Sequence, residues 1–388
     1  MSCRSAFLLT FTLSLFTKVY GQEDSLGAFT VNGYLKFLQT IYYQDFNKQW
    51  LVDNLIHNRL NFKYLPDDHF HADLELRNRF FYGQSVQTIP GYSKLINAKT
   101  GFFNLSDILL KGNSYFLHST IDRAYIDLIY GKFQVRAGRQ RINWSQNLVW
   151  NPNDVFNTYS YFDFDYEERP GTDAIKVQYY TGLTSNVEAV YEIADSLKGM
   201  AFAGMYRFNK SGYDFQFLGG YVKNDWVVGT GWSGHIGGAG FRGEATYFYS
   251  NYPQALKKAQ LVAAISGDYT FKNSLYAQLA IIYNSRGSSG KAPFSENIFY
   301  SSLSAKNLTP ARTEILGQVS YPFTPLVNGG IAGIVNPLDQ SFFFGPSFTF
   351  SLQDNLELLL MGQIFEGPKG TEYGDFGKLI YWRIKWSF

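Results

Sequence analysis

The chain has 388 residues, of which 45% are hydrophobic and 18% aromatic, with 34 basic side chains against 32 acidic ones. A nearly neutral chain lacks the strongly basic character of a general nucleic-acid-binding surface, so we expect no nucleic-acid partner. The only cysteine is Cys3, and without disulfides the stability must come from a large core or a closed sheet. Beyond the N-terminus no apolar run approaches the roughly 20 residues of a membrane-spanning helix, which excludes a polytopic helical membrane protein.

The N-terminus has the pattern of a secretory signal peptide. Arg4 supplies positive charge, residues 6–16 form a short apolar stretch, and small residues precede the expected cleavage site after Gly21. The alternative, an uncleaved membrane anchor, would be too short to cross a bilayer. We therefore predict a signal peptide at residues 1–21 and a single domain at residues 22–388. Cleavage would remove two basic residues and leave 32 basic and 32 acidic ones.

Taken in chain order, the sequence alternates polar and apolar side chains in segments of roughly ten residues, the length of a tilted transmembrane strand. Residues 57–64, for example, place polar side chains on one face and mostly apolar ones on the other. The count is about eighteen strands, with sixteen as the alternative, because boundaries read from one sequence are uncertain by a few residues. The predicted strands are residues 29–42, 50–63, 72–79, 119–130, 133–143, 173–180, 186–193, 199–208, 213–222, 226–234, 239–249, 260–269, 275–284, 313–321, 327–335, 342–352, 356–365 and 376–388.

The connectors between these segments also alternate in length. Short connectors, such as residues 65–68 and 131–132, all join an even-numbered predicted strand to the next odd-numbered one. The long connectors, residues 83–114, 144–172 and 285–312, fall at the alternate positions. Short turns on one rim and long loops on the other are typical of outer-membrane barrels, whereas a soluble sandwich has no reason to separate them. We therefore predict an all-β, up-and-down antiparallel transmembrane β-barrel.

The last predicted strand alternates faces and ends on an aromatic residue. One face carries Ile380, Trp382, Ile384, Trp386 and Phe388, which suits lipid and an aromatic girdle. The strand resembles the C-terminal recognition strand of bacterial outer-membrane proteins. That resemblance implies that Trp382, Trp386 and Phe388 form an assembly signal, read by barrel-assembly machinery at the periplasmic rim. It also implies export to the outer membrane of a Gram-negative bacterium, with outer-membrane lipid around the barrel.

A barrel of this size is wide enough for an aqueous channel unless loops fill it. Its N-terminal strands carry many charges on the face opposite the apolar one. Such side chains either brace the wall as mixed-charge ladders or set the electric field of a pore. The predicted lumen and selectivity residues are Arg59, Lys63, Asp73, Glu75, Arg77, Arg79, Arg123, Asp127, Arg136, Arg139 and Arg141.

The strand that contains Arg136 runs into a long connector, residues 144–170, rich in Trp, Asn and acidic side chains. Strict alternation places Arg136 on one face and Arg139 and Arg141 on the other, so all three face the lumen only if Gly138 marks a β-bulge. A connector folded inward could dock its acids on these arginines and narrow the channel. The alternative is a solvated external loop. The predicted constriction residues are Trp144, Asp154, Asp163, Asp165, Glu167 and Glu168.

The segment Gly138-Arg139-Gln140 followed by Trp144, with Asn151, Pro152 and Asp154 downstream, resembles a pattern in porin-like and exporter-like outer-membrane barrels. The resemblance is detailed in this segment and only architectural elsewhere. It implies a passive porin or a barrel that conducts or exports small solutes.

Enzymatic and metal sites are weaker interpretations. His69 and His71 share a strand face but have no third ligand at a diagnostic spacing. The acids of residues 163–168 lack the regular loop of a calcium site, and Ca²⁺ binding there is kept as an alternative. No serine or histidine lies in a recognisable nucleophile motif. We therefore expect no metal, no cofactor and no enzyme. A channel or solute transporter is favoured over a surface-binding or assembly barrel, with an outer-membrane hydrolase third, and the oligomeric state is not predicted.

Overall fold

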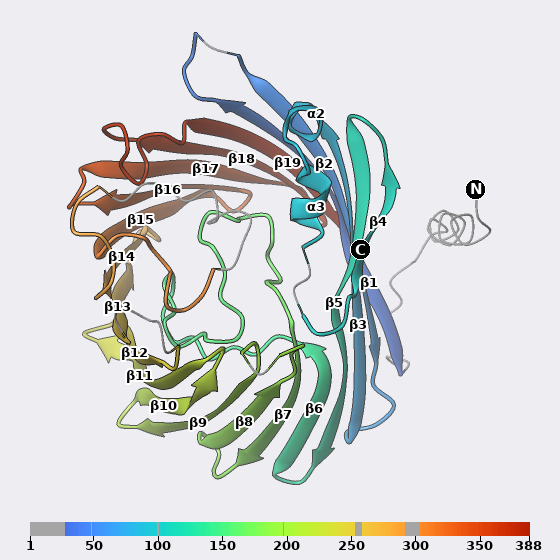
Figure 1. Ribbon diagram of the computed structural model, residues 1–388, viewed down its shortest axis with the longest axis vertical. Helices are drawn as coiled ribbons and strands as arrows, with labels where there is room; N and C mark the ends of the chain where they lie inside the picture. Colours follow the sequence, from blue (N-terminus) through green and yellow to red (C-terminus); the bar gives the residue numbers. More distant parts are fainter. Residues whose placement is uncertain (1–27, 48, 99–100, 197, 253–257, 292–302) are drawn as a thin grey trace.

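A computed structural model describes residues 28–47, 49–98, 101–196, 198–252, 258–291 and 303–388. Within these residues nineteen strands form one sheet that closes on itself (Figure 1). Closure occurs because β1 (Phe29–Tyr43) pairs antiparallel with both β2 (Leu51–Tyr64) and β19 (Lys378–Ser387). The predicted signal peptide, residues 1–21, lies outside the described residues.

Of these nineteen strands, eighteen make the barrel wall and one, β4 (Ser106–Lys111), is additional. β4 pairs with the first half of β5 (Tyr115–Tyr130), while β3 (Phe70–Gly83) lies on the other side of β5. The predicted antiparallel barrel and its upper strand count of eighteen are confirmed. The remaining wall strands are β6 (Phe133–Gln140), β7 (Thr172–Tyr180), β8 (Asn186–Glu192), β9 (Ala201–Lys210), β10 (Tyr213–Val222), β11 (Asp225–Ile236), β12 (Ala239–Ser250), β13 (Ala259–Thr270), β14 (Tyr276–Asn284), β15 (Thr313–Thr324), β16 (Val327–Asn336), β17 (Ser341–Gln353) and β18 (Leu356–Glu366).

Three elements of the long connector between β3 and β5 were not predicted. Besides β4, the connector contains the short helices α2 (Gln84–Thr88) and α3 (Tyr92–Ile96). The strand predicted at residues 133–143 is shorter than expected, because β6 ends at Gln140 and the chain then leaves the wall. No helix among the described residues is both long and apolar enough to cross a membrane.

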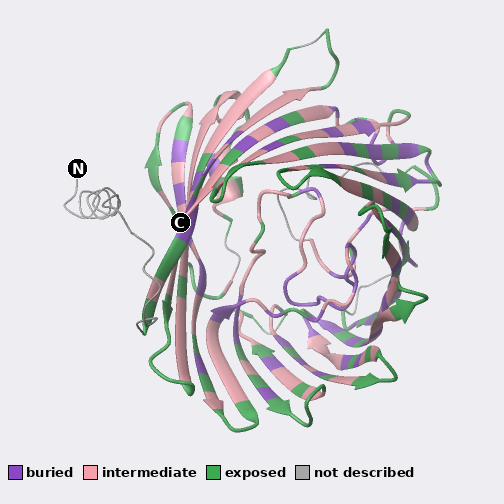
Figure 2. Cartoon of the chain, turned by 180° about the vertical axis from the view of Figure 1, so that it is seen from behind, coloured by how far each residue is buried: buried purple, intermediate pink, exposed green. Residues whose placement is uncertain are grey.

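Side chains alternate between the two faces of the wall, as a pleated strand requires. In β19 the outward Ile380 and Ile384 are 44% and 37% exposed, whereas the inward Tyr381 and Arg383 are 8% and 7% exposed. The same alternation gives the banded burial of the wall in Figure 2. Apolar residues face outward and polar residues face inward because only the interior offers them hydrogen-bond partners.

The two chain ends of the barrel meet at the rim that carries the short turns. The N–H of Leu65, just after β2, donates to the carbonyl of Ala28 at 2.6 Å. The N–H of Phe388 donates to the carbonyl of Gly33 at 3.0 Å, and the N–H of Gly33 donates back at 2.8 Å. The long connectors therefore leave the wall at the opposite rim. One of them, residues 141–171 between β6 and β7, runs through the interior of the barrel (Figure 1).

Candidate functional site: the connector inside the barrel

The interior connector, residues 141–171, carries much of the buried apolar cluster of the protein. Ile142 and Trp144 are fully buried, and the Trp144 ring meets Phe156 edge to face with 5.1 Å between centroids. Further along, Phe162 packs against Phe343 of β17 and Phe365 of β18, at centroid distances of 5.1 and 5.5 Å. The connector is therefore packed against the inner wall and is not solvated on all sides.

One end of the connector is held by a buried carboxylate. Glu244 of β12 is 1% exposed and accepts three backbone N–H groups of the connector. Gln146 and Asn147 donate to Oε1, the latter at 2.7 Å, and Asn153 donates to Oε2 at 2.9 Å. A connector without secondary structure has backbone donors to satisfy, and a carboxylate is the strongest acceptor available. Thr246, also on β12, donates to the carbonyl of Pro152 at 2.9 Å.

Trp144, a predicted constriction residue, is part of this attachment. Its indole Nε1 donates to Glu188 of β8 at 3.0 Å, and its carbonyl accepts from Gln216 of β10 at 2.6 Å. The ring therefore lies against the wall formed by β8 and β10. Trp144 holds the connector in place and does not project into open space.

The acids of the connector bind the wall on a different sector of the barrel, formed by β19, β1 and β2. Asp165 lies 3.1 Å from Lys36 Nζ, 3.1 Å from His57 Nδ1 and 3.5 Å from Arg383 Nη1. Glu167 pairs with the same lysine at 3.4 Å and with Lys385 at 2.8 Å. Burial acts to raise the pKa of Asp165, but the His57 hydrogen bond and the Lys36 and Arg383 charges hold that pKa well below its usual range. Asp165 is therefore ionised at neutral pH.

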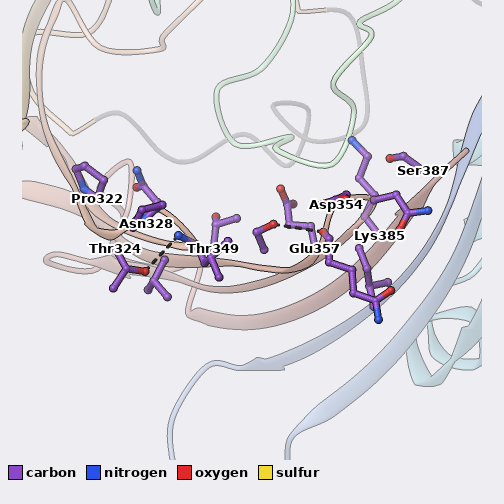
Figure 3. Close-up of a pocket in the computed structure, with 15 residues that line it drawn as sticks. Pro322, Thr324, Asn328, Thr349, Asp354, Glu357, Lys385 and Ser387 are labelled. Atoms are coloured by element: carbon purple, nitrogen blue, oxygen red, sulfur yellow. Dashed lines mark hydrogen bonds between the residues drawn. The ribbon is translucent and has the colours of Figure 1, made fainter. Parts of the chain in front are cut away.

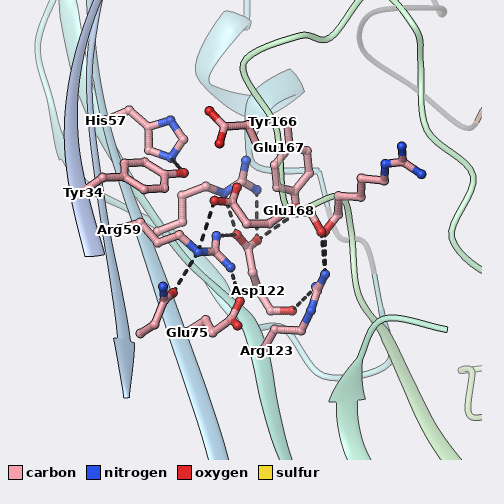
Figure 4. A network of polar contacts seen from close by, with 12 residues as sticks. Tyr34, His57, Arg59, Glu75, Asp122, Arg123, Tyr166, Glu167 and Glu168 are labelled. Atoms are coloured by element: carbon pink, nitrogen blue, oxygen red, sulfur yellow. Dashed lines mark hydrogen bonds and ion pairs between the residues drawn. The ribbon is translucent and has the colours of Figure 1, made fainter. Parts of the chain in front are cut away.

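A second ionic group surrounds Asp122, which sequence reasoning missed (Figure 4). The register of β5 against β3 shifts beside Asp122, and this β-bulge turns its side chain inward together with that of Arg123. Asp122 accepts from Arg59 at 2.7 Å, from Arg77 Nη2 at 3.1 Å and from the Tyr166 hydroxyl at 3.1 Å. Strict alternation would place Asp122 outside, and nothing else in the sequence signals the bulge.

Other predicted residues join this group. Arg59 also pairs with Glu75 and lies 3.6 Å from Glu168. Arg123 donates to the carbonyl oxygens of Glu168 and Arg169 at 2.7 and 2.9 Å, and so holds the connector through its backbone.

The expectation that the acids of the connector dock on Arg136 or Arg139 is wrong. Arg136 pairs with Asp127 on the neighbouring strand at 2.6 Å. Arg139 pairs with Asp173 on β7 at 2.7 Å and donates to the carbonyl of Phe103. Both arginines find acids in the adjacent wall, so the acids of the connector bind cations elsewhere.

The bulge suggested at Gly138 is also absent. The pairing of β6 with β5 and β7 runs through Gly138 without a shift, although its φ is 123°. Arg136 and Arg139 therefore do not share a face, and their joint assignment to the lumen is wrong. Arg141 lies beyond the end of β6 and is part of the connector itself.

The remaining predicted residues occupy separate places. Lys63 and Asp73 face each other across β2 and β3 near the short-turn rim. Arg79 lies 3.2 Å from His118 Nδ1 and over the Phe81 ring at 5.2 Å. In the connector, burial raises the pKa of Asp154 to about 8 against the lowering charge of Arg141, and burial also raises the pKa of Asp163.

A polar cavity of about 300 Å³ opens at the short-turn rim (Figure 3). Asn328, Thr349, Glu357, Lys385 and Ser387 are among the residues that line it. Through its bond to Glu167, the Lys385 ammonium connects this cavity to the interior connector. Across the described residues, no group of three or more His, Cys, Asp or Glu side chains is arranged to hold a metal ion. The acids at 165, 167 and 168 are paired with lysine and arginine instead.

Comparison with known proteins finds solved structures of similar fold but no matching sequence family. No protein-family model and no curated protein matches the sequence. Among solved structures, the outer membrane protein OprD from Pseudomonas aeruginosa is similar with a TM-score of 0.61 at 8% identity, covering 94% of this chain and 95% of that one. OccK11 (OpdR) of the same organism gives 0.59 at 8% identity, covering 95% and 99%. Acinetobacter baumannii OccAB1 gives 0.57 at 11% identity, covering 95% and 98%. At such identities the likeness is one of fold: the chain has the barrel architecture of these proteins over nearly its whole length.

Proposed function

We propose that this protein is a non-enzymatic channel for small solutes in the outer membrane of a Gram-negative bacterium. The observation that carries the proposal is the connector, residues 141–171, which runs through a wide barrel and is attached to several sectors of its wall. A barrel of eighteen strands is wide enough for an aqueous path. An interior segment attached to the wall narrows that path without blocking it. The similar fold of OprD, an outer membrane protein by its description, supports the location.

In this proposal the charged side chains of the lumen act as a paired array. The cations Lys36, Arg59 and Arg77 lie on the wall, and their partners are the wall acid Asp122 and the connector acid Asp165. The three cations are 0–8% exposed, so in this proposal the array fixes the position of the connector and the width of the path, and the solute does not contact it. The outward-facing Trp382 and Trp386, with Phe388, are proposed as the assembly signal in the outer-membrane lipid.

Conductance of the purified protein in planar lipid bilayers tests the proposal. We expect stepwise ion currents from the intact chain and larger steps after deletion of residues 144–170, because the deletion removes the segment that fills the lumen. Folding of the deletion variant is checked first by its heat-dependent mobility in detergent gels. A folded deletion variant that stays shut would count heavily against a channel.

A further inference from the structure

Polar side chains interrupt the outer face of the barrel in one sector. Elsewhere the outward positions are dominated by exposed apolar residues such as Phe217, Val228 and Leu279, which are 52%, 66% and 55% exposed. On the strands β1, β2, β3 and β5, by contrast, amides and a hydroxyl lie between the apolar residues. The outward polar residues of this sector, here called the polar row, are Gln39, Asn54, Asn58, Asn78 and Ser119.

The direction of these side chains follows from their neighbours. Asn58 lies between His57 and Arg59, which are both buried inside the barrel, and Asn78 lies between Arg77 and Arg79. Because successive residues of a strand point to opposite faces, Asn58 and Asn78 point outward. Trp382, outward on β19, donates its indole N–H to the Gln39 amide at 2.9 Å, which places Gln39 outside as well.

The polar row lies within the apolar band and not at a rim. Along each strand the residues two positions before and after every member are apolar: Phe37 and Ile41, Val52 and Ile56, Ile56 and Leu60, Leu76 and Phe80, and Leu117 and Ile121. In the proposed membrane location this level is surrounded by hydrocarbon, out of reach of water and lipid headgroups.

The members are in register and bind one another. Asn58 pairs across to Asn78, and Asn78 across to Ser119. Asn78 donates to Asn58 at 3.3 Å, and the Ser119 hydroxyl donates to Asn78 at 2.7 Å. Gln39 donates to Asn54 at 3.0 Å. An amide has two N–H donors and two acceptor lone pairs, so these bonds use only part of what the row offers.

Hydrogen-bonding capacity left over in hydrocarbon is costly, and the usual solution is contact with another protein surface. We propose that the outer face of β1, β2, β3 and β5 binds a second copy of this chain. This inference rests on the membrane location in the proposed function.

A second copy is the partner that fits the chemistry of the row. Amides and hydroxyls donate and accept equally, so the row is complementary to itself, and the members carry no charge that would repel an identical face. The row ends at the edge strand β4, whose exposed Asp107 pairs in register with Ser119 and places one acid beside the uncharged members. Among the described residues β4 pairs in register only with β5, and an open edge favours pairing with another chain.

Thiol cross-linking in membranes tests the contact directly. In the full chain with Cys3→Ser, we would introduce Asn58→Cys or Ser119→Cys, with Leu279→Cys on β14 as the matched outward control. A bifunctional maleimide should convert the first two into products of two copies and leave the control monomeric. Equal cross-linking at all three positions, no cross-linking, or cross-linking mainly to a different protein would each overturn the proposal.

A double variant, Asn58→Leu with Asn78→Leu, distinguishes two roles of the polar row: contact between copies, and stabilisation of the wall within one barrel. Loss of the shared hydrogen bonds should lower the association constant in lipid by roughly tenfold or more, while the thermal stability of the barrel is retained or raised. Thr230→Leu on β11 is the control, because Thr230 is opposite the outward Phe217 and lies outside the polar row. A variant that stays associated but loses barrel stability would show that the row only braces the wall. Conductance and membrane insertion are measured on the same samples, so failure of the channel proposal is seen separately from failure of the contact.

Discussion

Replacement of Glu244 should free the interior connector from one of its attachments to the wall. The Glu244 carboxylate receives three backbone N–H groups and is 1% exposed, so water cannot take over these bonds in the folded state. In Glu244→Ala the N–H groups of Gln146, Asn147 and Asn153 lose their acceptor. The connector would then exchange between the docked position and displaced ones.

The size of the effect follows from the number of bonds. A hydrogen bond of about 1.5 kcal/mol lies at the top of the range for neutral groups and at the bottom of the range for charged ones, so three contribute about 4.5 kcal/mol. That energy corresponds to a change on the order of 10³-fold in the ratio of docked to displaced connector. The attachment through Asp165 remains, so the connector stays inside the barrel but moves.

Single-channel recording measures this movement. We expect Glu244→Ala to raise the mean conductance and the open-channel noise relative to the unaltered protein. The control is Asp268→Asn, which alters an acid on β13 that pairs with Arg242 of the wall and has no contact with the connector among the described residues. If Glu244→Ala and Asp268→Asn both give the same traces as the unaltered protein, the Glu244 carboxylate does not hold the connector.

Three further changes test other parts of the site. Asp165→Asn removes one of the negative charges beside Lys36 and Arg383 and should shift the reversal potential in a salt gradient toward anion preference. An unchanged or opposite shift would refute the pairing. The docked connector holds the Asp154 proton up to about pH 8, far above the ordinary value near 3.9, so docking should weaken as pH rises between these values. Open-channel noise should therefore increase with pH over this range. Asp154→Asn should abolish this pH dependence, and a variant that keeps it would show that another group is responsible. Deletion of Phe388 removes the backbone bonds to Gly33 and should impair membrane insertion far more than the conductance of inserted protein, as measured by fractionation, whereas normal insertion would argue against an assembly signal.

The wall of the barrel could be predicted because its determinants are local. A strand with one face outward must alternate, and the alternation is visible in ten residues without any knowledge of partners. β4 lacked this signal, since Ile108, Leu109 and Leu110 are consecutive apolar residues and its register against β5 shifts between the first and the last. The arrangement of side chains inside the barrel depends on partners that are far apart in the sequence. Alternation within one segment therefore does not predict it.

Asp122 and Glu244 show why the attachments could not be foreseen. Asp122 faces inward only because a β-bulge adds one residue to β5 at that point. Glu244 is a single acid in a glycine- and aromatic-rich strand, and its partners are backbone groups of a connector about a hundred positions away in the chain. Neither a bulge nor a backbone acceptor leaves a pattern in the side chains.

The arginines predicted to select ions do not form one positive surface. Arg59 and Arg77 share Asp122, and Arg136 is matched by Asp127. Opposite charges at hydrogen-bond distance cancel at the distance of a passing ion, so these arginines add little to the field along the path. Arg79 differs, because its neighbour is His118 and it has no acidic partner among the described residues. A net positive potential in this sector would therefore arise mainly from Arg79, and the ladder of arginines around it would chiefly hold the connector and the wall together.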